Sequence, residues 1–198
     1  RHNGDIPRIF IKEDYKSLPV KDMVVVDVGA NIGDSSIYFA LRGAKSIIAV
    51  EPVSSNYESM LKNVKLNKIT NIELKNVGVA GKKHIIVIDE DAASNGHMTE
   101  SDKGQEVELI TLEDIINEHH IELGVLKLDC EGYEHEIIMN TSPDILSKFK
   151  HIAAELHYDT IDPINEIKEK LTNCGFDVSF NYLISNTIPQ FMEAKKHL

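Results

Sequence analysis

The stretch VVVDVGANIGD, residues 24–34, decides the fold of this chain. Its β-branched start predicts a buried strand, and its glycines predict a tight turn that leads directly into a helix over residues 35–42. Asp34 is expected to cap this helix and Gly43 to end it. A strand that passes through a glycine turn into a helix is typical of the units that build parallel sheets.

The same alternation continues along the chain. A second strand is expected at 46–50, a helix at 54–66 and a third strand at 71–75. Strands that alternate with helices predict an α/β fold, in which helices cover both faces of a mostly parallel sheet. Residues 1–22 are expected to form an N-terminal arm or cap, and residues 23–198 a cofactor-binding catalytic core, together a single domain.

The second half of the chain shows the same signals. Thr111 is expected to cap a helix that runs to about His120, Ser142 to cap a short helix, and Asp162 to begin a helix that Gly175 closes. Further strands and one long polar loop are expected. The strands lie at 84–88, 106–110, 125–129, 152–156, 176–180 and 190–195, and the loop at 91–104.

The composition argues against several classes of partner. The chain carries 32 acidic and 21 basic residues, a net charge of −11, so neither a nucleic acid nor an anionic membrane surface is an expected partner. No apolar run approaches the roughly 18 residues that a membrane span needs. Cys130 and Cys174 are too few for a disulfide framework and are interpreted as reduced, which favours a cytoplasmic location.

Carboxylates stand at the ends of most of the predicted strands. In a parallel sheet of this kind, ligands bind at the carboxyl ends of the strands. A carboxylate buried there costs desolvation unless it meets a donor, so acids along this edge indicate a binding site. The segments at the strand ends are Asp27 with the glycine turn, Glu51-Pro52, Asn76-Val77-Gly78, Asp129-Cys130-Glu131-Gly132 and Glu155-Leu156-His157.

The glycine turn and Glu51 indicate what kind of ligand binds. Gly29 and Gly33 let the backbone approach a ligand closely, and Glu51 is placed to accept hydrogen bonds from both ribose hydroxyls. Such a turn serves either a dinucleotide or S-adenosylmethionine. Asn31 stands where a dinucleotide site has the glycine that makes room for pyrophosphate, and Asp27 would repel that group. The ammonium and sulfonium of S-adenosylmethionine favour an acid there, so the methyl donor is the expected cofactor.

Three motifs stand out when they are read together. They are VDVGANIGD at 26–34, VEP at 50–52 and LKLDCEGYE at 126–134, and the segments at 111–114 and 155–157 follow the same pattern in the same order. Over residues 22–195 the chain thereby resembles the FkbM family of S-adenosylmethionine-dependent methyltransferases. The resemblance implies a Rossmann-like class I methyltransferase fold, a seven-stranded sheet whose last strand is antiparallel, and O-methylation of a sugar or natural product.

The strand-end argument and the resemblance together predict the residues that bind S-adenosylmethionine. They are Asp27, Gly29, Ala30, Asn31, Gly33, Glu51, Pro52, Asn76, Val77 and Asp129. Two positions depart from the family pattern. Cys130 replaces a more usual valine, which is expected to be harmless. Asn76 stands where many related enzymes have an acid near the adenine, which weakens the case for an adenine contact by its side chain.

His157 is the leading candidate for the general base that removes a proton from an acceptor hydroxyl. Imidazole titrates near neutrality, and His157 ends an apolar strand beside the central one. Glu155 lies two residues earlier, so both side chains are expected on one face of that strand, where Glu155 orients His157 or contacts the substrate. Asp129 and Glu131 flank the turn after the central strand and are the competing candidates for the base.

Several alternatives stay open at this point. His97, in the loop at 91–104, is a second base candidate on a segment long enough to act as a substrate lid. Asp129, Glu155 and His157 together could hold a divalent cation, although no metal is expected. Other functions are a nicotinamide-dependent oxidoreductase, which Asp27 disfavours, and a non-catalytic S-adenosylmethionine-binding module. The expected partner is a small-molecule or glycan acceptor.

Overall fold

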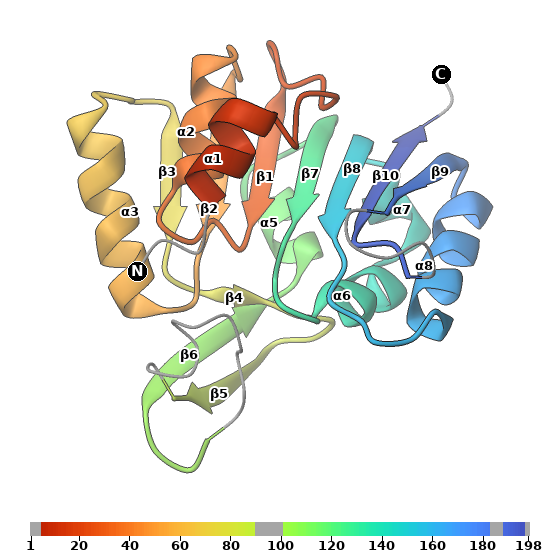
Figure 1. Cartoon of the computed structure of the whole chain (residues 1–198). Coiled ribbons are helices and arrows are strands. Elements are labelled where there is room, and N and C mark those ends of the chain that lie inside the picture. The colour runs from red at the N-terminus through yellow and green to blue at the C-terminus, as the bar shows by residue number, and fades with distance from the viewer. Residues whose placement is uncertain (1–4, 90–100, 183–187, 197–198) are drawn as a thin grey trace.

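The computed structural model describes residues 5–89, 101–182 and 188–196. Within them, seven strands form one sheet in the order β3-β2-β1-β7-β8-β10-β9, which Figure 1 shows. In chain order the strands are β1 (Val24–Val28), β2 (Ser46–Val50), β3 (Ile72–Lys75), β7 (Gly124–Leu128), β8 (Phe149–Glu155), β9 (Phe176–Asn181) and β10 (Phe191–Lys196). Most of the loop expected at 91–104, including His97, lies outside the described residues.

Strand direction in this sheet confirms the predicted fold class. Neighbouring strands from β3 to β8 run parallel, whereas β10 is antiparallel to both β8 and β9. Val28 in β1 lies opposite Val50 in β2 and Leu128 in β7. The residues that follow these three strands therefore leave the sheet at the same edge.

Helices cover both faces of the sheet, as predicted. Alternate side chains of β1 point to opposite faces, so Val25 packs with α2, α3 and the arm, whereas Val26 and Val28 pack with α5, α6 and α8. The helices of the core are α2 (Asp34–Leu41), α3 (Ser54–Leu66), α5 (Leu112–Glu118), α6 (Glu134–Asn140), α7 (Pro143–Leu146) and α8 (Asp162–Asn173). Among the described residues, no helix combines the length and the apolar character that crossing a bilayer requires.

A second, smaller sheet lies beyond the carboxyl ends of the main strands (Figure 1). Its strands β4 (Gly78–Val79), β6 (Gln105–Ile110) and β5 (His84–Ile88) pair in that order. The first residue of β6 fastens this sheet to the loop after β2. The Gln105 side chain donates to the Pro52 carbonyl over 2.8 Å and accepts from the Ser54 amide over 2.9 Å. The small sheet therefore braces one of the strand ends at which a ligand is expected.

The N-terminal arm packs on the main sheet at residues 5–22. It begins with α1 (Asp5–Pro7) and η1 (Arg8–Lys12). The buried ring of Tyr15 lies 5.7 Å from the ring centroids of both Phe39 and Phe191. Arg42 donates from its guanidinium to the carbonyls of Tyr15 and Lys16. The arm is thus held along one face of the sheet by apolar contacts and by hydrogen bonds from the Arg42 side chain to its backbone.

Several element boundaries differ from the sequence prediction by one to three residues, and those of α2 and β8 bear on the site. Helix α2 begins at Asp34 itself, with Gly33 as its N-cap at a φ of +87°. The turn packs closely on α3 at this point, and a Cβ on Gly33 would lie 2.8 Å from Met60 Cγ. The close packing and the left-handed backbone both favour glycine at position 33. Strand β8 runs over Phe149–Glu155 and ends one residue earlier than expected. The cap expected at Thr111 is confirmed, because Thr111 and Asp114 form a capping box.

Candidate functional site

One pocket lies where β1, β7 and β8 end, and the arm forms part of its wall. The strand ends and the glycine turn contribute Gly29, Asn31, Lys127, Asp129 and Glu155. Helix α2 contributes Asp34 and Ser35, and the arm contributes Arg8, Ile9, Asp14 and Tyr15. The pocket therefore occupies the edge of the sheet at which the sequence predicts a ligand, and it brings together carboxylates, two cations and a glycine turn.

Gly29 lets the turn after β1 approach the turn after β7. Its φ is +73°, and a Cβ at this position would lie only 1.8 Å from the backbone oxygen of Asp129. The amides of Gly29 and Ala30 both donate to the Val50 carbonyl over 3.0 Å. Gly29 is thus needed for contact between three strand ends, in addition to the close approach of a ligand that the sequence suggests.

Asp27 lies beneath the glycine turn and is fully buried. Its Oδ2 accepts hydrogen bonds from the hydroxyls of Ser35 and Ser36 over 2.6 Å, and its Oδ1 lies 3.2 Å from Lys127 Nζ. The expected direct attraction between Asp27 and a cationic ligand therefore needs correction, because the Asp27 charge is already paired. Asp27 instead holds the turn from within.

Lys127 is a functional-site residue that the sequence reasoning missed. Burial lowers the pKa of this lysine, but Asp27 and then Asp129 outweigh that effect and raise it well above its usual range. Its Nζ donates to the Gly29 carbonyl over 2.7 Å and lies 3.5 Å from Asp129 Oδ2. The available signal is a single lysine in the otherwise apolar strand GVLKL, where burial demands a partner.

Glu51 and its neighbours form the next strand end. Glu51 is 4% exposed, so it is not simply an acid of a solvent-exposed loop. Its Oε2 accepts from the Asn31 amide over 2.9 Å and its Oε1 from the Val53 amide over 3.0 Å. Burial raises the pKa of Glu51, and these two amides oppose that effect. Asn76 donates to the carbonyls of Glu51 and Pro52, so it braces this loop.

Val77 and Pro52 are both half-buried, and Val77 packs against the core beside the small sheet. Of the residues predicted to bind the cofactor, Gly29, Asn31 and Asp129 line the pocket directly. The predicted set therefore divides into a group at the pocket wall and a group, including Glu51 and Asn76, that shapes the loops around it.

His157 lies among three carboxylates. Its Nδ1 is 3.1 Å from Glu134 Oε1, and its Nε2 is 3.8 Å from Asp129 Oδ1 and 3.7 Å from Glu131 Oε2. Burial lowers the pKa of His157, but the hydrogen bond to Glu134 and the charges of the three acids outweigh it and raise the pKa to about 9. The near-neutral titration expected from the sequence is therefore wrong for this imidazole.

Glu155 occupies a different environment from His157. Its Oε1 accepts from Arg8 Nη1 over 2.8 Å, and the same guanidinium pairs with Asp14. Strand β8 ends at Glu155, so the alternation of side chains stops before His157 and the two residues meet different partners. The expectation that Glu155 orients His157 is wrong. Glu155 pairs with Arg8, and the carboxylate that contacts His157 Nδ1 is that of Glu134.

Glu134 joins the ends of β7 and β8. It is fully buried, and its carboxylate accepts from the amides of Cys130 and Gly132, from the Tyr158 hydroxyl and from His157. Burial raises the pKa of Glu134, but the hydrogen bond and the charge of His157 lower it overall. In the sequence, Glu134 stands out only as the last residue of the motif at 126–134.

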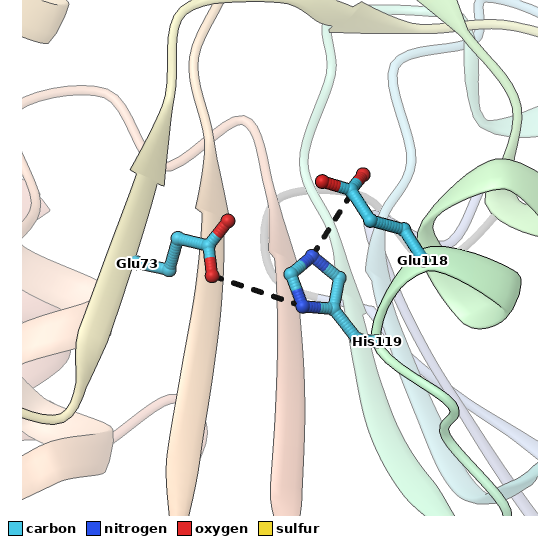
Figure 2. Close-up of side chains that lie close together, drawn as sticks. All are labelled: Glu73, Glu118 and His119. Atoms are coloured by element: carbon cyan, nitrogen blue, oxygen red, sulfur yellow. Dashed lines mark ion pairs between the residues drawn. The ribbon is translucent and has the colours of Figure 1, made fainter.

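A second group of acids with a histidine lies between β3 and α5 (Figure 2). His119 Nδ1 is 3.7 Å from Glu73 Oε2, and His119 Nε2 is 4.0 Å from Glu118 Oε2. Lys75 Nζ lies 2.6 Å from Glu118 Oε1 and 3.4 Å from Glu73 Oε1. This lysine bridges the two acids, so the group is an ion-pair network between a strand and a helix.

The comparisons with known proteins agree with this geometry. The family model described as Methyltransferase FkbM domain matches residues 27–178. No curated protein matches the chain. Solved structures with a similar fold include an rRNA methylase of Streptococcus thermophilus, with 15% identity, 95% of each chain covered and a TM-score of 0.61.

Two further structures show the same fold. An S-adenosylmethionine-dependent O-methyltransferase of Thermotoga maritima is 15% identical, with 99% of this chain and 66% of that chain covered and a TM-score of 0.52. A ribosomal protein L11 methylase of Lactobacillus delbrueckii subsp. bulgaricus is also 15% identical, with 98% and 81% covered and a TM-score of 0.53.

The pocket residues fit S-adenosylmethionine. The amino-acid end of this cofactor carries a carboxylate and an ammonium, and its sulfonium adds a further positive charge. The pocket wall carries both signs of charge, in the Arg8–Glu155 pair and in Asp129 beside Lys127, and the partly exposed Asp129 can face the positive groups of the cofactor. The cofactor is S-adenosylmethionine, the fold is the Rossmann-like class I methyltransferase fold, and the chain belongs to the FkbM family of methyltransferases.

Proposed function

We propose that this methyltransferase acts on a hydroxyl oxygen of a sugar or another small-molecule acceptor. The observation that carries the proposal is the group formed by Asp129, Glu131 and His157 at the ends of β7 and β8. Asp129 also lines the pocket, so this group borders the place at which the cofactor binds. A hydroxyl is a weak nucleophile that must lose its proton during transfer, and acids beside the pocket are suited to accept it.

The chain contributes alignment and proton transfer to this reaction. The cofactor supplies an electrophilic methyl group on a sulfonium. The acceptor oxygen forms a bond to that methyl carbon, the carbon–sulfur bond breaks with its electron pair left on sulfur, and the hydroxyl proton passes to Asp129 or Glu131. His157 faces both acids through Nε2 and orients the acceptor oxygen between them. Glu155, paired with Arg8, borders the same pocket and contacts the acceptor from the arm side.

Several wider features belong to the same proposal. The whole chain, 1–198, works as one methyltransferase domain whose arm completes the pocket wall. The net charge of −11 supports a small acceptor and argues against RNA, although one of the similar structures is an rRNA methylase. The free thiols of Cys130 and Cys174 support a cytoplasmic location.

Product analysis tests the proposed reaction. The full chain is incubated with S-adenosylmethionine and a panel of glycosides and hydroxylated small molecules, and the release of S-adenosylhomocysteine is measured. We expect a methyl ether in the product, located by NMR, and a rate that falls by at least about 10²-fold in Asp129→Asn. Methylation of a nitrogen atom, or transfer to RNA alone, would contradict the proposal.

Glu51→Ala is expected to weaken S-adenosylhomocysteine binding at least about tenfold, which is roughly 1.4 kcal/mol. Glu51 holds the amides of Asn31 and Val53, so its loss loosens the turn as well as the proposed contact with the ribose. Calorimetric titration measures the affinity. Glu58→Ala, which removes an exposed acid of α3, is the control and should bind normally. Unchanged affinity in Glu51→Ala would show that this carboxylate has no part in cofactor binding.

A further inference from the structure

We propose that Asp129 Oδ1, Glu131 Oε2 and His157 Nε2 form a binding site for a divalent cation. The inference deepens the proposed function and rests on it, because the cation would hold the acceptor oxygen beside the cofactor. The three ligand atoms lie within 4.8 Å of one another, on the turns that follow β7 and β8. Glu131 thereby takes the place that the sequence reasoning gave to Glu155, whose carboxylate is paired with Arg8.

The spacing of the three atoms fits a cation between them. His157 Nε2 is 3.8 Å from Asp129 Oδ1 and 3.7 Å from Glu131 Oε2, so both distances are too long for direct hydrogen bonds. Nitrogen and oxygen ligands lie roughly 2.0–2.2 Å from a metal such as zinc, so two ligands of one ion can be up to about 4.2 Å apart. The two distances from His157 Nε2 are therefore compatible with an ion that the imidazole shares with each carboxylate.

The orientation of His157 is fixed by a residue outside this group of three. Glu134, which is fully buried, holds Nδ1 at 3.1 Å and leaves Nε2 directed at the two acids. A carboxylate that binds the second nitrogen of a ligating histidine is a recurrent feature of metal sites, where it sets the tautomer and the ring orientation. Tyr158 and the Gly132 amide hold Glu134 in turn, so this support is part of the fold.

The local charge also favours a dication. Four carboxylates gather here, and the basic groups beside them are one lysine and one imidazole. The acids are Asp27, Asp129, Glu131 and Glu134, and the basic groups are Lys127 and His157. Among the ion pairs of the described residues, acids thus outnumber basic groups here, and His157 would bind the ion through Nε2 in its neutral form.

Figure 2 shows a second place where two acids and a histidine lie together. There Lys75 Nζ approaches Glu118 Oε1 to 2.6 Å and Glu73 Oε1 to 3.4 Å, so one lysine bridges both acids. At His157, the nearest lysine is Lys127, and it approaches Asp129 through Oδ2, the oxygen that does not face the imidazole. The other oxygen of Asp129, Oδ1, faces His157 Nε2 at 3.8 Å.

Two carboxylates with one imidazole suit Mn²⁺ or a similar transition ion better than Ca²⁺, which prefers oxygen ligands throughout. An acceptor hydroxyl that coordinates such an ion would lose its proton more readily, because a bound cation lowers the pKa of a coordinated oxygen. Asp129, Glu131 and His157 would hold the ion, which would favour loss of the hydroxyl proton to solvent as the oxygen bonds to the methyl carbon and the carbon–sulfur bond breaks.

Direct binding of Mn²⁺ to the full chain tests the site without any acceptor. Electron paramagnetic resonance of free Mn²⁺ is expected to reveal one site per chain. Glu131→Gln should raise the dissociation constant at least about tenfold, and Glu134→Gln about 10- to 100-fold through the orientation of His157. Glu118→Gln, from the group in Figure 2, is the matched control and should bind Mn²⁺ as wild type does. Thermal unfolding confirms that each variant is folded.

The outcomes separate this inference from the proposed function. Equal Mn²⁺ binding by wild type, Glu131→Gln and His157→Gln would overturn the cation site. Methyl ether formation that is unchanged by EDTA would also overturn it, while leaving O-methylation intact. Mn²⁺ binding that is lost in Glu131→Gln supports the site even if the methyl product proves to be an amine, in which case the proposed function alone fails.

Discussion

Gly29→Ala is expected to lower the free energy of unfolding by more than about 3 kcal/mol, or to prevent folding altogether. Two costs act together at this position. The φ of +73° is unfavourable for any residue with a Cβ, and the added carbon would lie 1.8 Å from the Asp129 oxygen. Because that oxygen belongs to the backbone, no side-chain rotation relieves the overlap, and the turns after β1 and β7 must separate.

Gly175→Ala is the matched control for this prediction. Gly175 has a φ of +85°, but nothing lies within 4 Å of the place that its Cβ would take. Its replacement therefore tests the backbone cost alone, about 1–2 kcal/mol. Urea denaturation measures both variants. If Gly29→Ala and Gly175→Ala lower the free energy of unfolding by similar amounts, the overlap with the Asp129 oxygen adds nothing to the cost of the left-handed backbone.

Lys127→Met is expected to destabilise the fold by about 3–5 kcal/mol, because it leaves a buried carboxylate without its counter-charge. Asp27 is fully buried and its Oδ1 lies 3.2 Å from Lys127 Nζ. The same change removes the donor to the Gly29 carbonyl, so S-adenosylhomocysteine binding should weaken as well. Denaturation and calorimetric titration measure the two effects separately.

The double variant Asp27→Asn with Lys127→Met isolates the charge pair. The amide oxygen introduced by Asp27→Asn still accepts hydrogen bonds at the position that Ser35 and Ser36 contact, while the unpaired charge is gone. We expect the double variant to be more stable than Lys127→Met alone by at least about 1 kcal/mol. A double variant that is no more stable than the single one would show that the stability comes from packing of the lysine chain and not from its charge.

The fold could be predicted from the sequence because its signals are local. The β-branched run at β1, the glycine turn and the start of α2 are consecutive in the chain, and each strand and helix carries its own periodicity. The capping box at Thr111 is likewise contained in four residues. Such patterns specify an element without reference to the rest of the molecule.

The ion pairs of the site could not be predicted in the same way. Arg8 and Glu155 are separated by 147 residues, and nothing near either of them indicates the other. The two-residue spacing of Glu155 and His157 predicts a shared face only while a strand continues, and β8 ends at Glu155. Glu134 is only the last residue of a motif in the sequence, and the fold brings His157 to it.

The position of β10 determines how the sheet can be completed as the chain is made. β10 (Phe191–Lys196) lies between β8 and β9, yet it follows both in the sequence. During synthesis, β8 and β9 each expose an unpaired edge until residues 191–196 have left the ribosome. Exposed edges of this kind can pair with another chain. The C-terminal half of the sheet therefore closes in one late step, and a ribosome that stalls before residue 191 leaves an aggregation-prone intermediate.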